Sequence, residues 1–404
     1  EIAATKVELG LNPGEHFAFP QNLLDHARLV KKRGAAAREQ WDKKFDLWKK
    51  EQPDRAKTLS RVLSQQLPSD WDSLIPSFEA GKEIATRKAS GDVINALAHK
   101  LPEMWGGSAD LADSNNTTIE GGGSFLPTAS KMAGADPYGR IIHFGIREHA
   151  MGAILNGMAL HGLVKPFAGT FLVFSDYMRG AVRLSALMQL PVTYVWTHDS
   201  IGLGEDGPTH QPVEHLSALR AIPGLAVVRP ADANEVSACW VEIIKNAKPV
   251  GLALSRQNLP VIDRNKFKST GNVKKGAYVL AYGDESSTDK CDVILIATGS
   301  EVQLAVKAQQ LLAERKIAVR VVSMPSTTTF DQQSVEYKLS VLPANLPRIA
   351  VEMGSPDFWW KYACAAVVGI STFGESAPAP VLFEHFGFTT ENVAQTVQKV
   401  LATR

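Results

Sequence analysis

The chain has 404 residues, 45% hydrophobic and 21% charged, a composition that predicts a globular protein of two or three domains and excludes a disordered one. Its 43 lysines and arginines nearly balance its 42 acids, so the net charge of +1 provides no overall field for nucleic acid or an anionic membrane. The cysteines, Cys239, Cys291 and Cys364, are too far apart for a CxxC pair, and no apolar run could span a membrane, so we expect a cytoplasmic protein without disulfides.

The first expected segment, residues 1–76, is helical and highly charged. Its stretch KKRGAAAREQWDKKFDLWKKEQPDRAKTLSRV carries Trp41, Phe45 and Trp48 among lysines and acids, which predicts solvated helices with a narrow apolar stripe. No alternation of strands and helices appears there. We interpret this segment as a connector or the tail of a preceding domain.

Residues 77–263 have a different pattern, in which helical stretches such as ATRKASGDVINALAHKL alternate with short apolar runs. The runs IIHFG, PVTYVWTH, LAVVRP and VGLALSR are typical of buried strands. The polar stretch DRNKFKSTGNVKKGAY then reads as a linker, and a clear strand, helix and strand follow in CDVILIATGSEVQLAVKAQQLLAERKIAVRVVSMPS. We therefore predict two α/β domains with mainly parallel sheets, at 77–263 and 276–404, preceded by the helical connector.

Several candidate polar residues follow these expected elements. Asp110 and Ser114 lie in GGSADLADSN after a strand, where they could line a polar cradle or only form a turn. Arg87 in ATRKAS and Arg256 in ALSRQNLP suit a phosphate, although a surface ion pair is the commoner role of such arginines. In ATGSEVQL, the pattern favours a plain helix start with Ser300 as the N-cap and Glu301 in the first turn.

Two further candidates lie near the middle of the chain. Glu148 in FGIREHAMG begins a predicted helix, where the helix dipole alone favours an acid. Phe171, Phe174 and Tyr177 recur at three-residue spacing, which is usual for a core stripe but also suits stacking on a flat heterocycle.

The stretch THDSIGLGEDGPTHQP, residues 197–212, cannot be an ordinary helix or strand. It follows a strand, and its glycines permit backbone conformations that could hold His198, Asp206 and His210 around a small polar ligand. The alternatives are a glycine-rich turn with solvated side chains or a metal site, but no HxH or HxxxH spacing supports the latter. Asp199 and Glu205, with His149 of the earlier helix, are interpreted as structural.

In combination, these stretches resemble the transketolase family. The resemblance rests on eight motifs in order: GGSADLADSN, FGIREHAMGAILNG, TFLVFSDYMRGAVRLSAL, THDSIGLGEDGPTHQP, RPADANEVSACW, ALSRQNLP, IATGSEVQLAV and STFGESAPAP. It implies a thiamine diphosphate enzyme that moves a two-carbon ketol unit between sugar phosphates of the xylulose 5-phosphate and ribose 5-phosphate type. The matched parts are the family's pyrimidine-binding and C-terminal domains.

The resemblance also implies a role for individual residues. Glu148 would bond the ring nitrogen of the cofactor's pyrimidine and favour the imino form that deprotonates the thiazolium carbon, and with His210 it is a predicted catalytic residue. The predicted cofactor-binding residues are Glu148, Phe171, Phe174, Tyr177 and Asp110. The predicted substrate-binding residues are His210 and Asp206 for hydroxyls, and Arg87, Ser114, His198 and Arg256 for the phosphate.

One departure from the family shapes the remaining expectations. The family's GDG motif is not found, since GD occurs only as GDV at 91–93 and GDE at 283–285. We therefore expect that the N-terminal domain with the diphosphate and Mg²⁺ ligands is lacking, that residues 1–76 are a connector and only a remnant of it, and that this chain holds no metal ligands. It would then be a fragment that holds half of each active site and is inactive alone, because it needs that domain in cis or in trans. The intact enzyme would be a homodimer. A subunit of a split enzyme is the less favoured interpretation.

Three alternatives remain open at this stage. Dihydroxyacetone synthase shares these motifs. A 2-oxo acid dehydrogenase beta subunit also lacks the diphosphate domain, although the 197–212 stretch paired with ALSRQNLP suits sugar phosphates better than an oxo acid. A non-catalytic partner subunit with the same fold is the third alternative.

Overall fold

The computed structural model describes residues 1–283 and 291–403, in two compact units, Glu1–Gln66 and Leu67–Arg404. Residues 284–290 and Arg404, which fall within the predicted 276–404 domain, lie outside the described residues, as do the last two residues of the GDE motif.

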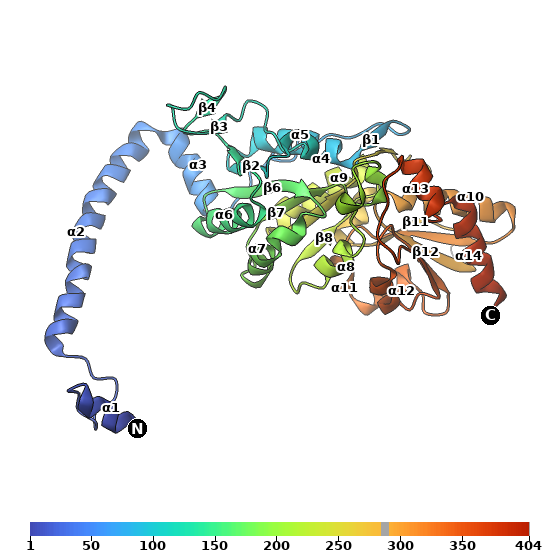
Figure 1. The fold of residues 1–404 in the computed structure, drawn as a ribbon. Coiled ribbons are helices and arrows are strands. Elements are labelled where there is room, and N and C mark those ends of the chain that lie inside the picture. Colours follow the sequence, from blue (N-terminus) through green and yellow to red (C-terminus); the bar gives the residue numbers. More distant parts are fainter. Residues whose placement is uncertain (284–290, 404) are drawn as a thin grey trace. The chain divides into compact units, whose positions relative to one another are not determined.

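The first unit is helical, as the charge pattern predicts. Its helices are α1 (Ile2–Glu8), α2 (Gln21–Glu51) and α3 (Pro53–Leu63), and none of them has a buried residue (Figure 1). Trp41 and Phe45 stack with ring centroids 4.6 Å apart, and Phe45 and Trp48 stack at 5.5 Å. The apolar stripe of α2 is therefore a local aromatic stack, formed because residues three and four apart share one helix face.

The second unit contains an eight-stranded sheet in which every strand pairing is parallel. The strand order is β4-β3-β5-β2-β6-β7-β9-β8. The strands are β2 (Met104–Ser108), β3 (Ser124–Phe125), β4 (Ala135–Asp136), β5 (Ile141–His143), β6 (Lys165–Phe171), β7 (Thr193–Thr197), β8 (Ala226–Val228) and β9 (Val250–Leu254).

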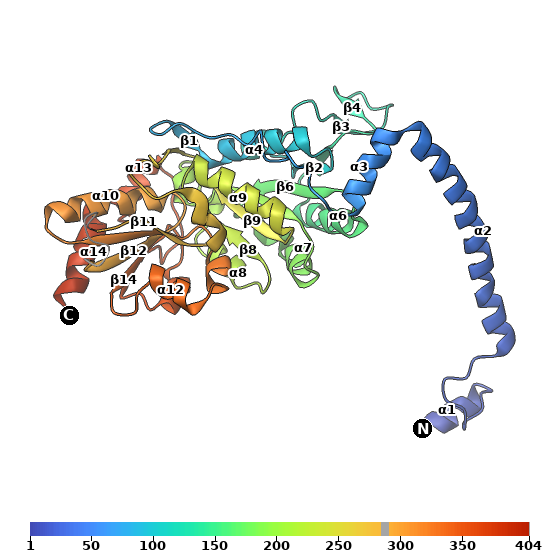
Figure 2. The ribbon, with the colours of Figure 1, turned by 180° about the vertical axis from the view of Figure 1, so that it is seen from behind.

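Helices cover both faces of this sheet (Figures 1 and 2). They are α4 (Thr86–Lys100), α5 (Ala112–Asn115), α6 (Glu148–His161), α7 (Ser175–Leu187), α8 (His215–Arg220) and α9 (Ala233–Asn246). Neighbouring strand residues join different cores: Val195 packs with α4 and α9, whereas Tyr194 and Trp196 pack with α6 and α7. Because successive side chains of a strand point to opposite faces, a strand buried on both faces is apolar throughout, as the sequence runs are.

The C-terminal sheet has five strands in the order β11-β13-β12-β14-β15, with β11 antiparallel to β13 and the other pairs parallel. Its strands are β11 (Tyr278–Ala281), β12 (Val293–Ala297), β13 (Val319–Ser323), β14 (Arg348–Val351) and β15 (Ala366–Val368). The helices beside it are α10 (Glu301–Glu314), α11 (Thr327–Asp331), α12 (Val335–Val341), α13 (Ala379–His385) and α14 (Thr390–Ala402). The predicted fold class, α/β with mainly parallel sheets, is confirmed.

Shorter elements complete the unit. A two-stranded antiparallel ribbon pairs β1 (Glu83–Ala85) with β10 (Asn258–Pro260). The 3-10 turns are η1 (Ile201–Leu203), η2 (Pro208–His210), η3 (Thr270–Lys275) and η4 (Pro356–Tyr362). Among the described residues, no helix is both long and apolar enough to cross a membrane, and the three cysteines are free.

A cluster of buried charged side chains connects segments next to the eight-stranded sheet with segments next to the five-stranded sheet. Arg229, fully buried after β8, bonds Asp199 at 2.8 Å and the carboxylate of Glu301, while Arg220 bonds Glu352 at 2.7 and 2.8 Å. The prediction that Glu301 only marks a helix start is therefore wrong. Its carboxylate is the buried partner of an arginine from the larger sheet, and the Ser300 side chain forms no cap bond to the helix backbone.

Candidate functional site

The strand order places the predicted site residues at one edge of the eight-stranded sheet. After β2 the chain forms β3, β4 and β5 on one side of β2, and then β6 to β9 on its other side. The direction in which strands are added to the sheet therefore reverses at β2. In such sheets ligands bind beyond the carboxyl ends of the strands, near this reversal. The predicted residues follow those ends: Asp110 and Ser114 after β2, Glu148 after β5, Phe171 and Phe174 at β6, His198 after β7 and Arg256 after β9.

His198 lies at the centre of this edge. It has a left-handed backbone (φ 60°), is 3% exposed, and its ring stacks on Phe171 with centroids 3.7 Å apart. Its Nδ1 lies 2.9 Å from the hydroxyl of Thr197. Burial, followed by the positive charges of Arg87 and Arg256, lowers the pKa of His198 to about 3. The imidazole is therefore neutral at physiological pH.

Arg87 and Arg256 bring two guanidinium groups to the same place. Arg87, in the first turn of α4, is half-buried and donates from Nη1 to the carbonyl oxygen of Ser114 at 2.8 Å. Burial and then the charge of Arg256 lower the pKa of Arg87, whereas Asp206 raises it. Arg256 is exposed. Two like charges in one partly buried place are unfavourable unless an anion joins them.

The loop after β7 places Asp206 and His210 beside His198. Gly204 and Gly207 have φ values of 95° and 102°, which a side chain would strain, so the glycines set the loop's path. The Asp206 carboxylate lies 3.8 Å from Nε2 of His198. His210 ends η2, and its ring meets the edge of Phe174 at 5.4 Å. The predicted loop residues thus lie together.

The predicted aromatic residues Phe171, Phe174 and Tyr177 form a row of neighbouring rings at the end of β6, called the aromatic wall below. Phe171 and Phe174 stack at 5.5 Å with an angle of 13° between their planes, and Phe174 and Tyr177 lie 5.9 Å apart. Phe171 is buried, Phe174 is half-buried and Tyr177 is 68% exposed. This gradient differs from a core stripe, in which all three rings would be covered, and leaves ring surface for a flat ligand.

Glu148 and Asp110 follow strands β5 and β2 at the same edge of the sheet. Glu148 is the first residue of α6 and is 8% exposed, yet it forms no hydrogen bond or ion pair with the residues that the structure describes. Asp110 is exposed with a left-handed φ of 62°. A carboxyl group at a mostly buried residue, with its oxygens free to accept or share a proton, is suited to a ligand that offers a hydrogen bond.

Sequence reasoning missed Arg229, which supports this edge from behind. It holds Asp199, the residue after His198, and joins it to Glu301, the first residue of α10 in the C-terminal domain. The available signal was an arginine directly after an apolar strand in LAVVRP, a position where an unpaired charge would be buried.

These features define an α/β protein whose sheet edge carries a cationic, polar and aromatic-lined ligand site. Family models match in three consecutive parts: the transketolase thiamine diphosphate binding domain at residues 1–68, the transketolase pyrimidine binding domain at 82–261 and the transketolase-like C-terminal domain at 276–389. The chain belongs to the transketolase family. The prediction that the N-terminal domain is lacking is wrong, because residues 1–68 match that domain's model, and the predictions of a fragment and of inactivity alone are not supported.

Individual relatives agree with the family models. The chain is 52% identical to a transketolase of Mycobacterium leprae over 99% of its own length and 47% identical to one of Bacillus subtilis over 99%. It also resembles the solved structure of a Pichia stipitis transketolase in complex with sedoheptulose 7-phosphate, with a TM-score of 0.92 and 44% identity over the whole chain. The chain spans 58%, 59% and 58% of the lengths of these three proteins.

Proposed function

We propose that the protein is a thiamine diphosphate-dependent transketolase, which transfers a two-carbon ketol unit from a ketose phosphate to an aldose phosphate. The observation that carries the proposal is the convergence of Arg87, Arg256 and His198 at the carboxyl edge of the sheet. The family match and the similarity to a transketolase solved with a sugar phosphate support the same reading.

The phosphate would lie between the two guanidinium groups. Arg87 already donates one bond to the Ser114 carbonyl, which fixes its direction, and an anion would offset the repulsion from Arg256. The neutral His198 ring adds a polar contact without a further charge. Ser114 thus acts through its backbone by positioning Arg87.

The hydroxyls of the sugar chain would meet Asp206 and His210. These side chains are partly exposed, and the turns that carry them are fixed by Gly204 and Gly207. A carboxylate accepts from a hydroxyl, and an imidazole can donate, accept or move a proton. We assign His210 the proton transfers at the substrate's oxygen atoms, because its ring borders both the aromatic wall and the loop.

The aromatic wall and Glu148 fit the flat, nitrogen-containing ring of thiamine diphosphate. Phe174, with Phe171 and Tyr177, offers ring surface for stacking, and the buried Glu148 carboxyl can share a proton with a ring nitrogen. When bound, the cofactor supplies the carbanion chemistry that a protein side chain cannot. Asp110 lies at the same edge, and we assign it to the cofactor side of the site.

The diphosphate and Mg²⁺ are assigned to the family's N-terminal domain, whose model matches residues 1–68. We also propose a homodimer acting in the cytoplasm, on sugar phosphates and without nucleic-acid or membrane partners. Exposed apolar side chains on α6, α7 and their ends support an interface. They are Ile146, Ile154, Leu160, Leu184, Leu187 and Met188, which are 46 to 78% exposed.

A comparison of phosphorylated and unphosphorylated acceptors tests the phosphate assignment. Arg87→Ala should raise KM for ribose 5-phosphate by roughly tenfold or more, because a hydrogen bond to a charged group contributes about 1.5–3 kcal/mol. Turnover of unphosphorylated ribose should change little. Lys88→Ala, next on the same helix and paired with Asp92, is the matched control. An equal loss with both sugars would refute the assignment.

A further inference from the structure

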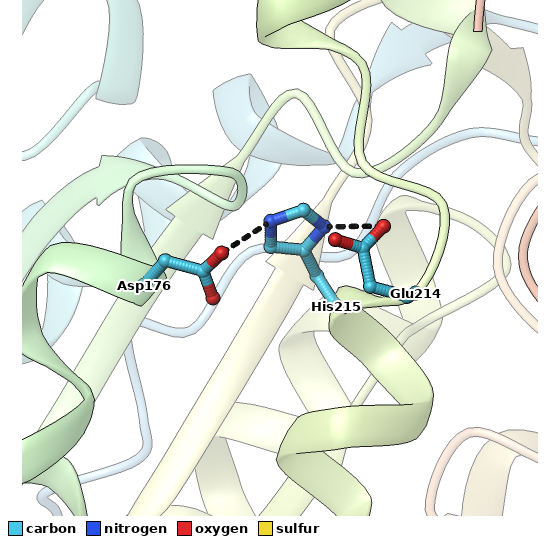
Figure 3. Close-up of side chains that lie close together, drawn as sticks. All are labelled: Asp176, Glu214 and His215. Atoms are coloured by element: carbon cyan, nitrogen blue, oxygen red, sulfur yellow. Dashed lines mark ion pairs between the residues drawn. The ribbon is translucent and has the colours of Figure 1, made fainter. Parts of the chain in front are cut away.

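A second group of metal-ligating side chains lies outside the residues assigned above. Asp176 belongs to the first turn of α7, and Glu214 and His215 lie at the start of α8. One donor atom of each lies within 4.8 Å of the others. Figure 3 shows the imidazole between the two carboxylates, with Asp176 facing one ring nitrogen and Glu214 the other.

His215 is buried without a satisfied ring nitrogen. It is 5% exposed, and neither Nδ1 nor Nε2 has a hydrogen-bond partner among the described residues. Carboxylate oxygens are nonetheless close, with Asp176 3.2 Å from Nε2 and Glu214 3.7 Å from Nδ1. Both separations are those of ion pairs, but the Asp176 pair is not aligned as a hydrogen bond and the Glu214 pair is too long for one. A buried imidazole in this situation is suited to another partner.

The 3.2 Å separation fits two ligands of one metal ion. Ligand atoms at about 2.0–2.2 Å from a zinc ion, at roughly tetrahedral or octahedral angles, stand about 3 Å apart. The oxygen of the second ligand then lies to the side of the nitrogen's lone pair, because the ion lies along it. Two such ligands are therefore close without the alignment of a hydrogen bond. We propose that Nε2 of His215 and the Asp176 carboxylate bind a divalent transition-metal ion of the zinc type, with water completing its ligands, while Glu214 at the other ring nitrogen orients the imidazole.

The chemistry of the three groups suits such an ion. An imidazole and carboxylates are ligands for Zn²⁺, Mn²⁺ and Co²⁺, whereas Mg²⁺ prefers oxygen alone. The Asp176 and Glu214 side chains are 57% and 59% exposed, which leaves an entry path and room for water ligands. The two helix N-termini oppose a cation, but two full negative charges outweigh their partial positive charges.

The ion would connect the segments that hold the two halves of the candidate active site. Helix α7 starts directly after Phe174, and α8 starts five residues after His210. A bond between Asp176 and His215 through a metal would fix the 5.4 Å edge contact between these two rings. The bound ion is therefore a positioning element and takes no part in the two-carbon transfer.

The test is titration of the metal-free 404-residue chain with Co²⁺ and with Zn²⁺, without thiamine diphosphate so that its cation is not counted. Visible absorption reports Co²⁺ coordination, and calorimetry gives the stoichiometry for Zn²⁺. Asp176→Asn and Glu214→Gln change exposed groups at constant shape, and His215→Gln removes the ring. His99→Gln, an exposed histidine at the end of α4, is the matched control.

We expect one ion per chain, bound by the wild type and by His99→Gln. Asp176→Asn and His215→Gln should weaken binding by at least about tenfold, since even groups that only orient a ligand contribute that much. Glu214→Gln should weaken it less, because Glu214 faces Nδ1 and orients the ring without binding the ion. No binding by the wild type would overturn the proposal. Equal binding by the wild type and Asp176→Asn would also overturn it, and this comparison still decides the matter if His215→Gln fails to fold.

Discussion

The burial of His198 has a consequence for stability that can be measured directly. Its pKa is lowered to about 3 in the folded protein, whereas an unfolded chain has the ordinary value of about 6.5. Between pH values of about 3 and 6.5, His198 binds a proton more tightly in the unfolded chain than in the folded protein. Lowering the pH therefore lowers the free energy of unfolding. The contribution is complete above about pH 6.5 and is lost progressively as the pH falls towards about 3.

Chemical denaturation at two pH values tests this. Between pH 6.5 and pH 5 the free energy of unfolding should fall by roughly 2 kcal/mol through His198, at about 1.4 kcal/mol per pH unit. His198→Asn should flatten that part of the pH profile, with His99→Asn as the control. Parallel profiles for wild type and His198→Asn would contradict the account.

Glu148 provides the second prediction at this scale. Glu148→Gln keeps the shape but cannot exchange a proton, so turnover should fall by about 10²–10⁴-fold, the range for general acid–base catalysis. Steady-state kinetics measures the loss, and thermal unfolding should be nearly unchanged. Glu205→Gln, an exposed acid of the 197–212 loop, serves as the control. A variant with wild-type turnover would remove Glu148 from the mechanism.

At the residue scale, the sequence indicated which side chains lie together at the sheet edge, but not whether each of them is protonated. The strand ends in PVTYVWTH and VGLALSR predicted the positions of His198 and Arg256. The lowered pKa of His198 depends on Phe171 and on two arginines distant in the chain, and no local pattern contains those contacts.

The buried charges around Arg229 act at the scale of elements, because they join the loop after β7 to α10 and β14. Two arginines, Arg220 and Arg229, face three acids, Asp199, Glu301 and Glu352. Burial raises the pKa of Glu301 despite Arg229, whereas for Glu352 burial is outweighed by Arg220 and Arg229, and its pKa is lowered. Of these two glutamates, Glu301 is therefore the one that tolerates loss of charge better.

Substitutions should follow this order. Arg229→Met leaves buried acids without their cation and should destabilise the protein by about 3–5 kcal/mol. Glu301→Gln removes the surplus negative charge and should cost clearly less. Thermal and chemical unfolding measure both, with Arg315→Met, on the surface, as the control. Greater destabilisation by Glu301→Gln than by Arg229→Met would contradict this charge balance.

The elements themselves were largely predictable, because doubly covered parallel strands are continuously apolar and helices separate them. The exception is Glu301. Its position at a helix start was read correctly from ATGSEV, but the reason for the acid lies in a residue more than seventy positions away in the chain.

For the whole molecule, the prediction that failed concerns residues 1–68. The charged helices were predicted, but they were interpreted as a connector and a remnant of a missing N-terminal domain, whereas residues 1–68 match the model of that domain. The helices carry no strand alternation and no ligand motif that would indicate the domain's presence. The boundaries at 76, 263 and 276 remain predictions. Recognition from short chemical motifs therefore succeeded for the sheet edge and failed for the helical part.

Two-carbon transfer from xylulose 5-phosphate to ribose 5-phosphate, with thiamine diphosphate and Mg²⁺ present, tests the central claim most directly when the wild type is compared with Glu148→Gln and Arg87→Ala. The account predicts product with the wild type, almost none with Glu148→Gln, and with Arg87→Ala a loss that saturating ribose 5-phosphate partly restores. No transfer by the wild type, or transfer indifferent to both substitutions, would contradict it.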